Sequence, residues 1–189
     1  MKYCNECGHP LIQALHLPDP RPRLTCEPCG LIHYENPKVL VWCLAHCGEK
    51  MLLCKRAIEP ARGLWNPPAG FVEAGETLEE AMARELKEET GIDLPPARFS
   101  LYRVASVPHM NQIYVGFRAE FDAEPALNPG PESAEVRFFA QQTIGPGEVA
   151  FNDMIPDTPA DVFARLRSRD FSVQCLTFRQ VRDGVEATF

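Results

Sequence analysis

One short segment sets the strongest limit on how this chain can fold. Residues 77–91 read TLEEAMARELKEETG. Thr77 followed by Glu80 matches a capping box, in which the hydroxyl and the carboxylate each accept a hydrogen bond from a free backbone N–H at a helix start. Gly91 is the kind of residue at which a helix commonly ends. The pattern therefore predicts an α-helix that starts at residue 78 and stops before Gly91.

The predicted helix carries its acidic residues in an unusual place. Glu85, Glu88 and Glu89 are spaced i, i+3 and i+4, so they share one face. Toward the helix start, the same face continues through Leu78, Ala81 and Met82. Carboxylates in line with a buried stripe repel one another unless a cation lies among them, and a hard divalent cation takes such oxygen ligands. The alternative interpretation is a solvated face on which Glu80, Arg84 and Glu88 form a ladder of weak ion pairs.

A longer segment around this helix matches a known signature. Residues 70–92 read GFVEAGETLEEAMARELKEETGI: Gly, five residues, Glu, seven residues, Arg-Glu, an aliphatic, any residue, Glu-Glu, any residue, Gly, an aliphatic. The chain thus resembles the Nudix hydrolases. The resemblance implies an α/β/α sandwich with a mixed sheet, and an enzyme that uses metal-activated water to hydrolyse the diphosphate bond of a nucleoside diphosphate derivative.

The resemblance also assigns roles to individual residues. It implies that three glutamates bind the catalytic Mg²⁺ or Mn²⁺: Glu85, Glu88 and Glu89. The family glutamate that matches Glu85 can also act on the water. Gly70 is expected to offer its carbonyl to the metal, Arg84 to orient a neighbouring carboxylate, and Glu76 to support the loop or a second metal. The intact set of glutamates argues against a regulatory Nudix module without catalysis.

A second acidic segment supplies candidates for a base or an extra metal ligand. Residues 130–139 read GPESAEVRFF, which places Glu132 and Glu135 just before or within a predicted strand. Nudix hydrolases often recruit another acid from a loop beyond the helix. A charged loop entering a sheet explains the same pattern equally well, so both interpretations stay open.

Four cysteines near the N-terminus have the spacing of a structural zinc site. Cys4, Cys7, Cys26 and Cys29 form C-x2-C-x18-C-x2-C, and a glycine follows the second cysteine of each pair. Residues 1–35 are poor in long apolar side chains, so Zn²⁺ would organise a segment that cannot fold around its own core. Zinc ribbons also bind nucleic acid, but this segment shows no basic stripe.

The remaining cysteines look structural. Cys43 and Cys47, together with His46, lie in a strand pattern and read as core residues, as do Cys54 and Cys175. The four other histidines, His9, His16, His33 and His109, have no spacing that singles any of them out.

Apolar patterns and turn residues predict the order of the other elements. The expected elements are a β-hairpin at 39–47 and 50–56, a loop at 57–68, a short strand and turn in AGFVEAGE, strands near 98–107, 112–122 and 134–140, a helix from 160 to about 169, and a strand in SVQCLTFRQV. Strands with inserted helices indicate a mixed α/β layered fold. We expect a zinc ribbon at 1–35, a Nudix domain at 36–156, and an extension at 157–189 packed on that domain, for which no motif indicates a role.

Composition limits the partners and the location. The formal net charge of −7 argues against nucleic acid as a partner, because binding the phosphate backbone needs a basic surface. The longest apolar run, VLVWCLA, is too short to cross a bilayer, and the N-terminus lacks an apolar signal segment. We expect a soluble cytoplasmic protein with no membrane contact and a small-molecule nucleotide substrate. A homodimer is implied only by the family resemblance.

The combination of a zinc ribbon with a Nudix domain narrows the substrate. NADH pyrophosphatases carry a motif of the form S-Q-P-W-P-F-P after the signature, and this chain has nothing like it. The segments YENPK, LLCKR, GLWNPPAGF, GPES and RFFA resemble the branch that includes ADP-ribose and FAD pyrophosphatases. That resemblance implies release of AMP from FAD or ADP-ribose, with NADH or NAD as the alternative. Three aromatic residues could stack on a base or equally be core: Trp65, Tyr114 and Phe138.

Overall fold

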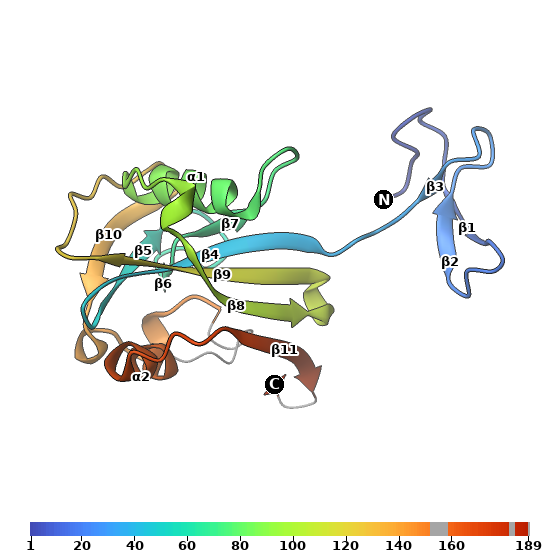
Figure 1. Ribbon diagram of the computed structural model, residues 1–189. Helices are drawn as coiled ribbons and strands as arrows, with labels where there is room; N and C mark the ends of the chain where they lie inside the picture. The colour runs from blue at the N-terminus through green and yellow to red at the C-terminus, as the bar shows by residue number, and fades with distance from the viewer. Residues whose placement is uncertain (152–158, 182–183, 189) are drawn as a thin grey trace. The chain divides into compact units, whose positions relative to one another are not determined.

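The computed structural model describes residues 1–151, 159–181 and 184–188. The chain divides into two compact units, Met1–Asn36 and Pro37–Phe189, which are described separately (Figure 1). No helix among the described residues is long and apolar enough to cross a membrane.

The first unit is a small antiparallel sheet with two glycine turns. Its strands are β1 (Ile12–Leu15), β2 (Pro22–Thr25) and β3 (Ile32–His33), in the order β1-β2-β3. Gly8 and Gly30 both have a φ of 73°, and their amides donate to the carbonyls of Cys4 and Cys26 at 3.0 and 2.7 Å. A positive φ favours glycine, which explains why each cysteine pair is followed by one. None of the residues of this unit belongs to a hydrophobic core cluster, so its order must come from another source.

The second unit is built on a nine-stranded mixed sheet. Its strands are β4 (Lys38–Cys47), β5 (Lys50–Arg56), β6 (Trp65–Asn66), β7 (Ala69–Phe71), β8 (Ser100–Val107), β9 (Gln112–Phe121), β10 (Ser133–Phe139), β11 (Gln174–Val181) and β12 (Gly184–Thr188). The main order is β10-β5-β4-β9-β8-β11-β12. The pairs β4/β9 and β8/β11 are parallel and the others are antiparallel, so the predicted mixed sheet is confirmed.

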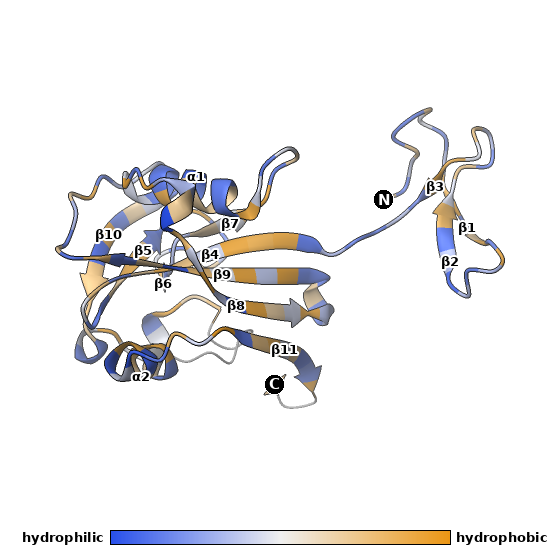
Figure 2. Cartoon of the chain, in the orientation of Figure 1, coloured by the Kyte–Doolittle hydropathy of each residue, from blue (hydrophilic) through white to orange (hydrophobic). Residues whose placement is uncertain are grey.

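Two helices pack on opposite faces of this sheet (Figure 1). They are α1 (Leu78–Thr90) and α2 (Pro159–Ser168). Successive side chains of β4 point to opposite faces of the sheet. Val41 and Cys43 belong to the same core cluster as residues of α1, whereas Leu44 belongs to another cluster with Phe163 of α2. Figure 2 shows apolar residues along the central strands and polar residues over much of both helices. The predicted α/β/α sandwich is therefore confirmed. Short 3₁₀ turns lie at Pro96–Arg98, Pro108–Met110, Gln141–Thr143 and Pro146–Glu148.

The helix α1 begins and ends as its sequence predicts. The amide of Glu80 donates to the Thr77 hydroxyl at 3.2 Å, and the amide of Thr77 donates to the Glu80 carboxylate at 2.8 Å. Gly91 closes the helix in the left-handed conformation, with a φ of 77°. Ala81, Met82 and Leu86 are buried against the sheet, whereas Leu78 is 36% exposed, so the buried stripe starts one turn later than the sequence suggests.

The sheet opens between β4 and β5, although these two strands form a hairpin. Only His46↔Met51 and Cys47↔Lys50 pair across it. Farther from the turn, β5 pairs with β6 and β4 pairs with β7. The sequence predicts the hairpin correctly, but it treats 57–68 as loop throughout and so misses β6. Residues of both strands and of α1 line a single cavity at this opening.

The C-terminal part of the chain extends the sheet. The predicted strand in this region is β11, which lies parallel to β8, and β12 continues the edge without having been predicted. Cys43 and Cys54 are buried in the core, as expected, but Cys175 is exposed on β11. The expectation that Cys175 is a core residue is wrong, because it points to the outer face next to buried Leu176.

Candidate active site

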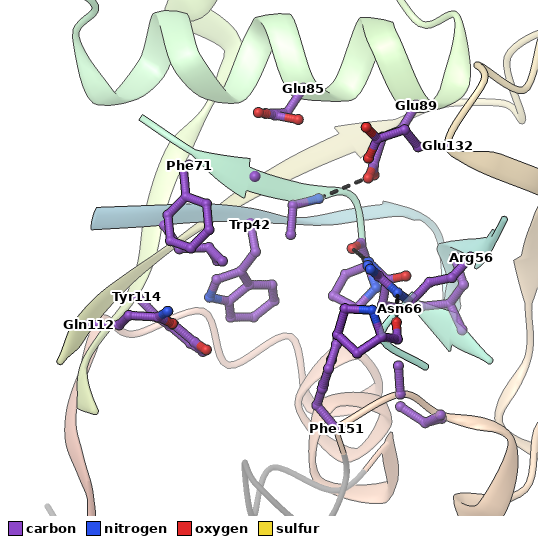
Figure 3. Close-up of a pocket in the computed structure, with 18 of the residues that line it drawn as sticks. Trp42, Arg56, Asn66, Phe71, Glu85, Glu89, Gln112, Tyr114, Glu132 and Phe151 are labelled. Atoms are coloured by element: carbon purple, nitrogen blue, oxygen red, sulfur yellow. Dashed lines mark hydrogen bonds between the residues drawn. The ribbon is translucent and has the colours of Figure 1, made fainter. Parts of the chain in front are cut away.

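A cavity of about 980 Å³ lies at the opening between β4 and β5 (Figure 3). The glutamates of α1 lie along one side of it. The other walls include residues of β4, β7, β8 and β9 and of the segments near Arg56 and Phe151, with single residues of α2 and β11. In Figure 3, β7 runs between α1 and the aromatic wall, and Phe71, Trp42, Gln112 and Tyr114 lie on the side of β7 away from the helix. The cavity therefore joins an acidic region to an aromatic one.

Arg84 holds the acidic residues of the signature segment together. Its Nε donates to Glu76 at 2.6 Å, and one of its terminal nitrogens donates to Glu85 at 2.7 Å and to Glu88 at 3.2 Å. The other terminal nitrogen donates to the Phe71 carbonyl at 3.1 Å. The guanidinium, helped by the Glu73 amide, lowers the pKa of Glu76 to about 2. Arg84 and Glu76 thus tie the loop to the helix.

The other carboxylates are less well compensated. Burial raises the pKa of Glu85, and burial raises the pKa of Glu89 to about 8 despite a 3.2 Å hydrogen bond from the Ala69 amide. The side chain of Glu85 is 14% exposed, whereas that of Glu88 is 58% exposed. Buried carboxylates of like charge are costly unless a cation joins them. The donor set is therefore suited to a hard divalent cation, with Glu88 at the solvent side.

The glutamate oxygens are more spread out than the cysteine sulfurs. Among the described residues, only the four cysteines bring three or more such ligand atoms within 4.8 Å of one another. The Arg84 guanidinium donates to both Glu85 and Glu88 and supplies positive charge there. Glu89 lacks that contact with Arg84. A cation would therefore stabilise the carboxylates most near Glu89.

Gly70 allows the backbone to approach Glu85 closely. A Cβ at position 70 would lie 2.0 Å from the Glu85 carboxylate carbon. Gly70 pairs with Val41 of β4, so the strand cannot easily move away. The geometry explains why the signature needs glycine here, and it keeps the Gly70 backbone beside the carboxylates.

Replacing Gly70 with alanine should therefore displace the Glu85 side chain. Because a misplacement of about 1 Å can cost roughly a hundredfold in rate, we expect kcat to fall by about that factor in Gly70→Ala. Gly147→Ala is the matched control, since a Cβ there meets no atom within 4 Å. Steady-state rates and thermal unfolding of both variants provide the check, and unchanged activity in Gly70→Ala would contradict the close approach.

The two acidic candidates beyond the helix separate in the structure. Glu132 lines the cavity together with Glu85 and Glu89 (Figure 3). Glu135 is exposed on β10, where it pairs in register with Lys55 and lies 3.7 Å from Arg137, and it does not line the cavity. The difference follows from position, because Glu132 is in the loop whereas Glu135 is already part of the strand.

Of the three aromatic candidates, only Tyr114 lines the cavity. Trp65 is buried edge-to-face against Phe139, with ring centroids 4.6 Å apart. Phe138 packs against the core cluster beneath α1. Trp65 and Phe138 therefore act in packing, which is the alternative that the sequence left open.

The sequence missed several residues that line the cavity. They include Trp42, Gln112, Arg56 and Asn66. The run VLVWCLA contained a usable signal, because strand alternation places Trp42 on the face opposite Val41 and Cys43. The polar Gln112 at the start of an apolar strand was a second, weaker signal.

The four N-terminal cysteines form a compact cluster. The sulfurs of Cys4 and Cys29 are 3.7 Å apart, and those of Cys7 and Cys26 are 3.3 Å apart. Four thiols at this separation suit a tetrahedral ion such as Zn²⁺, with all positions filled by sulfur. In a unit without a hydrophobic core, this cluster is the feature best placed to hold the fold.

Comparison with known families identifies both units. A family model described as NUDIX domain matches residues 36–157, and one described as Nudix N-terminal, a zinc ribbon, matches residues 2–35. The NAD-capped RNA hydrolase NudC of Stutzerimonas stutzeri is 33% identical over 136 residues, which cover 71% of this chain and 46% of that protein. NudC of Salmonella heidelberg is 31% identical over 165 residues, covering 84% and 60%. The chain spans about half the length of these curated relatives.

Solved structures agree with this assignment of the fold. The crystal structure of a NUDIX hydrolase from Nitrosomonas europaea is 38% identical with a TM-score of 0.79, and the match covers 94% of this chain and 99% of that one. The NUDIX domain of Shewanella oneidensis NrtR, solved with ADP-ribose, is 20% identical with a TM-score of 0.56, covering 71% and 90%. At that identity the second match shows the fold alone.

Proposed function

The chain belongs to the Nudix hydrolases and carries their zinc-ribbon N-terminal unit, and on this premise we propose that it cleaves the diphosphate bond of an NAD-type dinucleotide and releases AMP. The observation that carries the proposal is the cavity, where Glu85, Glu88 and Glu89 meet an aromatic wall large enough for a base. An acidic centre beside an apolar compartment matches a substrate with a diphosphate between two ring systems.

The relatives change the order of the candidate substrates. The sequence segments favour FAD or ADP-ribose, but the listed curated relatives at about 30% identity are named as hydrolases of NAD-capped RNA. The structures associated with ADP-ribose are 20–23% identical and support the fold only. NAD or NADH, the alternative in the sequence analysis, therefore ranks first. FAD and ADP-ribose stay as second candidates because the chain lacks the S-Q-P-W-P-F-P motif.

The residues of the site divide the chemical work. Glu85, Glu88 and Glu89 would hold the Mg²⁺ or Mn²⁺, with the Gly70 carbonyl as a further ligand. When bound, such a cation neutralises phosphoryl oxygens and lowers the pKa of a bound water. Arg84 keeps two of the carboxylates in place through its 2.7 and 3.2 Å hydrogen bonds. Glu85 or Glu132 would accept the proton of the attacking water, because both carboxylates border the same cavity.

A substrate panel tests this proposal. The purified protein is incubated with Mg²⁺ and, separately, with NAD, NADH, ADP-ribose, FAD or an RNA carrying a 5′-NAD cap, and AMP or 5′-monophosphate RNA is measured. We expect cleavage of NAD or NADH at the diphosphate, and none in excess chelator. Failure to cleave any compound of the panel would overturn the proposal. Cleavage of FAD or ADP-ribose alone would move the assignment to the second candidates.

The capped RNA in this panel also tests whether the negative net charge of the chain disfavours contacts with RNA. With a net charge of −7 and no basic stripe in the ribbon, we expect no more than weak RNA contacts beyond the cap. Comparing free NAD with NAD-capped RNA at two salt concentrations measures this directly.

A homodimer remains a prediction, and light scattering of the purified chain checks it.

A further inference from the structure

The aromatic wall of the cavity is a continuous surface made by the sheet register. Leu40 of β4 pairs with Tyr114 of β9, and Trp42 pairs with Gly116. Gln112 lies two residues before Tyr114, so strand alternation places both on the same face. All of these residues except Gly116 line the cavity. Trp42, Gln112 and Tyr114 lie on the side of β7 away from α1 (Figure 3).

The ring of Trp42 packs closely over the sheet because the neighbours of this residue are small. Its register partners on the two adjacent strands are Ala69 and Gly116. A Cβ at position 116 would come within 2.5 Å of the indole ring, so only glycine allows the ring to lie there. Trp42 and Tyr102 form a T-shaped pair, with ring centroids 5.8 Å apart and the planes 82° apart. The Arg103 guanidinium lies 5.9 Å from the centre of the indole, and both Trp42 and Arg103 line the cavity.

Gln112 offers an acceptor without a partner at the same wall. Its Oε1 is buried and has no hydrogen-bond partner among the described residues. The neighbouring Tyr114 is 8% exposed, and its hydroxyl is engaged with the Met110 sulfur at 3.6 Å. A buried acceptor without a partner is costly, so it is normally matched by a ligand or water. Leu40, Ala105 and Met110 are among the apolar residues that line the same cavity, and such a lining suits a ring.

We propose that Trp42 and Gln112 form a base-binding subsite, in which a nitrogen heterocycle of the substrate stacks on the indole and donates an edge N–H to Gln112 Oε1. The proposal rests on the proposed function for its choice of ligand. The N–H belongs to the adenine amino group or to the nicotinamide carboxamide, which present the same chemistry. The glutamates of α1 line the same cavity, so the diphosphate of a bound dinucleotide would face them.

Tryptophan fluorescence tests the subsite without relying on hydrolysis. The chain has two tryptophans, and Trp65 does not line the cavity. We expect AMP or NMN to quench the emission of the wild-type protein, and Trp42→Phe to keep the Trp65 emission but lose the quenching. Gln112→Leu should raise the dissociation constant of the same mononucleotide by about tenfold, which is the usual effect of removing one hydrogen bond in a buried site. Gln142→Leu, at an exposed position outside the cavity, should bind as the wild type does.

Substrate analogues identify the source of the N–H. Nicotinic acid adenine dinucleotide replaces the carboxamide with a carboxylate, and nicotinamide hypoxanthine dinucleotide replaces the adenine amino group. For the wild type, kcat/KM should be about tenfold lower on one of these analogues than on NAD, because KM is higher. In Gln112→Leu the two kcat/KM values should be equal. Thermal unfolding checks that each variant is folded. If Trp42→Phe is not folded, Trp42→Tyr replaces it in the fluorescence experiment.

Two results would overturn the subsite. One is the absence of quenching by both AMP and NMN, and the other is mononucleotide binding that Gln112→Leu leaves unchanged. Because the fluorescence measurement does not require turnover, a protein that binds AMP at Trp42 but cleaves no dinucleotide would refute the proposed function and leave the subsite standing.

Discussion

Glu88→Gln and Glu89→Gln are each expected to reduce kcat by about 10²–10⁴-fold on the preferred dinucleotide, because each removes a negative ligand from the proposed metal site while keeping the shape of the side chain. The effect should be on kcat more than on KM, since the metal acts mainly on the charge that develops in the transition state. Initial rates across a range of Mg²⁺ concentrations measure both the loss and any weaker dependence on the metal.

Thermal unfolding without added Mg²⁺ or Mn²⁺ distinguishes loss of chemistry from loss of fold. Burial raises the pKa of Glu89 to about 8, so its carboxylate is an unfavourable group in the metal-free protein. Glu89→Gln should therefore unfold at the same temperature as the wild type or above it. Glu79→Gln, on the same helix but outside the cavity, is the charge-matched control and should remain active. Full activity in both Glu88→Gln and Glu89→Gln would refute the role of the helix glutamates.

Cys26→Ser should remove the zinc and unfold the first unit. Structural zinc sites supply on the order of 10 kcal/mol of apparent folding free energy at neutral pH, and this unit has no hydrophobic core to replace it. Metal analysis should find about one Zn²⁺ per wild-type chain and much less in the variant. Amide hydrogen exchange should show loss of protection within residues 1–36.

The second unit gives this experiment its internal control. Within the described part of the chain, the residues that line the cavity all lie between Leu40 and Phe178, so hydrolysis should survive the loss of the ribbon's structure. Cys175→Ser replaces an exposed cysteine outside the cluster and should keep both zinc and stability. A Cys26→Ser protein with its zinc and its protected amides intact would show that Cys26 is not a ligand.

The acidic helix could be predicted almost completely from local sequence. Thr77, Glu80 and Gly91 set its ends through contacts within a few residues, and the spacing of Glu85, Glu88 and Glu89 follows from helix geometry. The cysteine cluster was predictable for a similar reason, because its spacing alone suggests a common ligand.

The aromatic wall could not be predicted in the same way. Trp42 and Gly116 are 74 positions apart, and their contact depends on the parallel register of β4 and β9. The opening between β4 and β5 depends on two strands of two and three residues, too short to leave a periodic signal. For Trp65 the sequence left stacking on a base and core packing equally open, and the pairing of β6 with β5 decides for burial.

The opening between β4 and β5 also divides the cavity into parts that can vary separately. The acidic residues come from α1, whereas Trp42, Gln112 and Tyr114 come from β4 and β9. Substitutions at sites without shared partners have nearly additive effects. A lineage of such proteins could therefore acquire new substrates through a few changes in the sheet while the helix stays the same, and preference for one dinucleotide over another would be expected to diverge faster than the hydrolytic step itself.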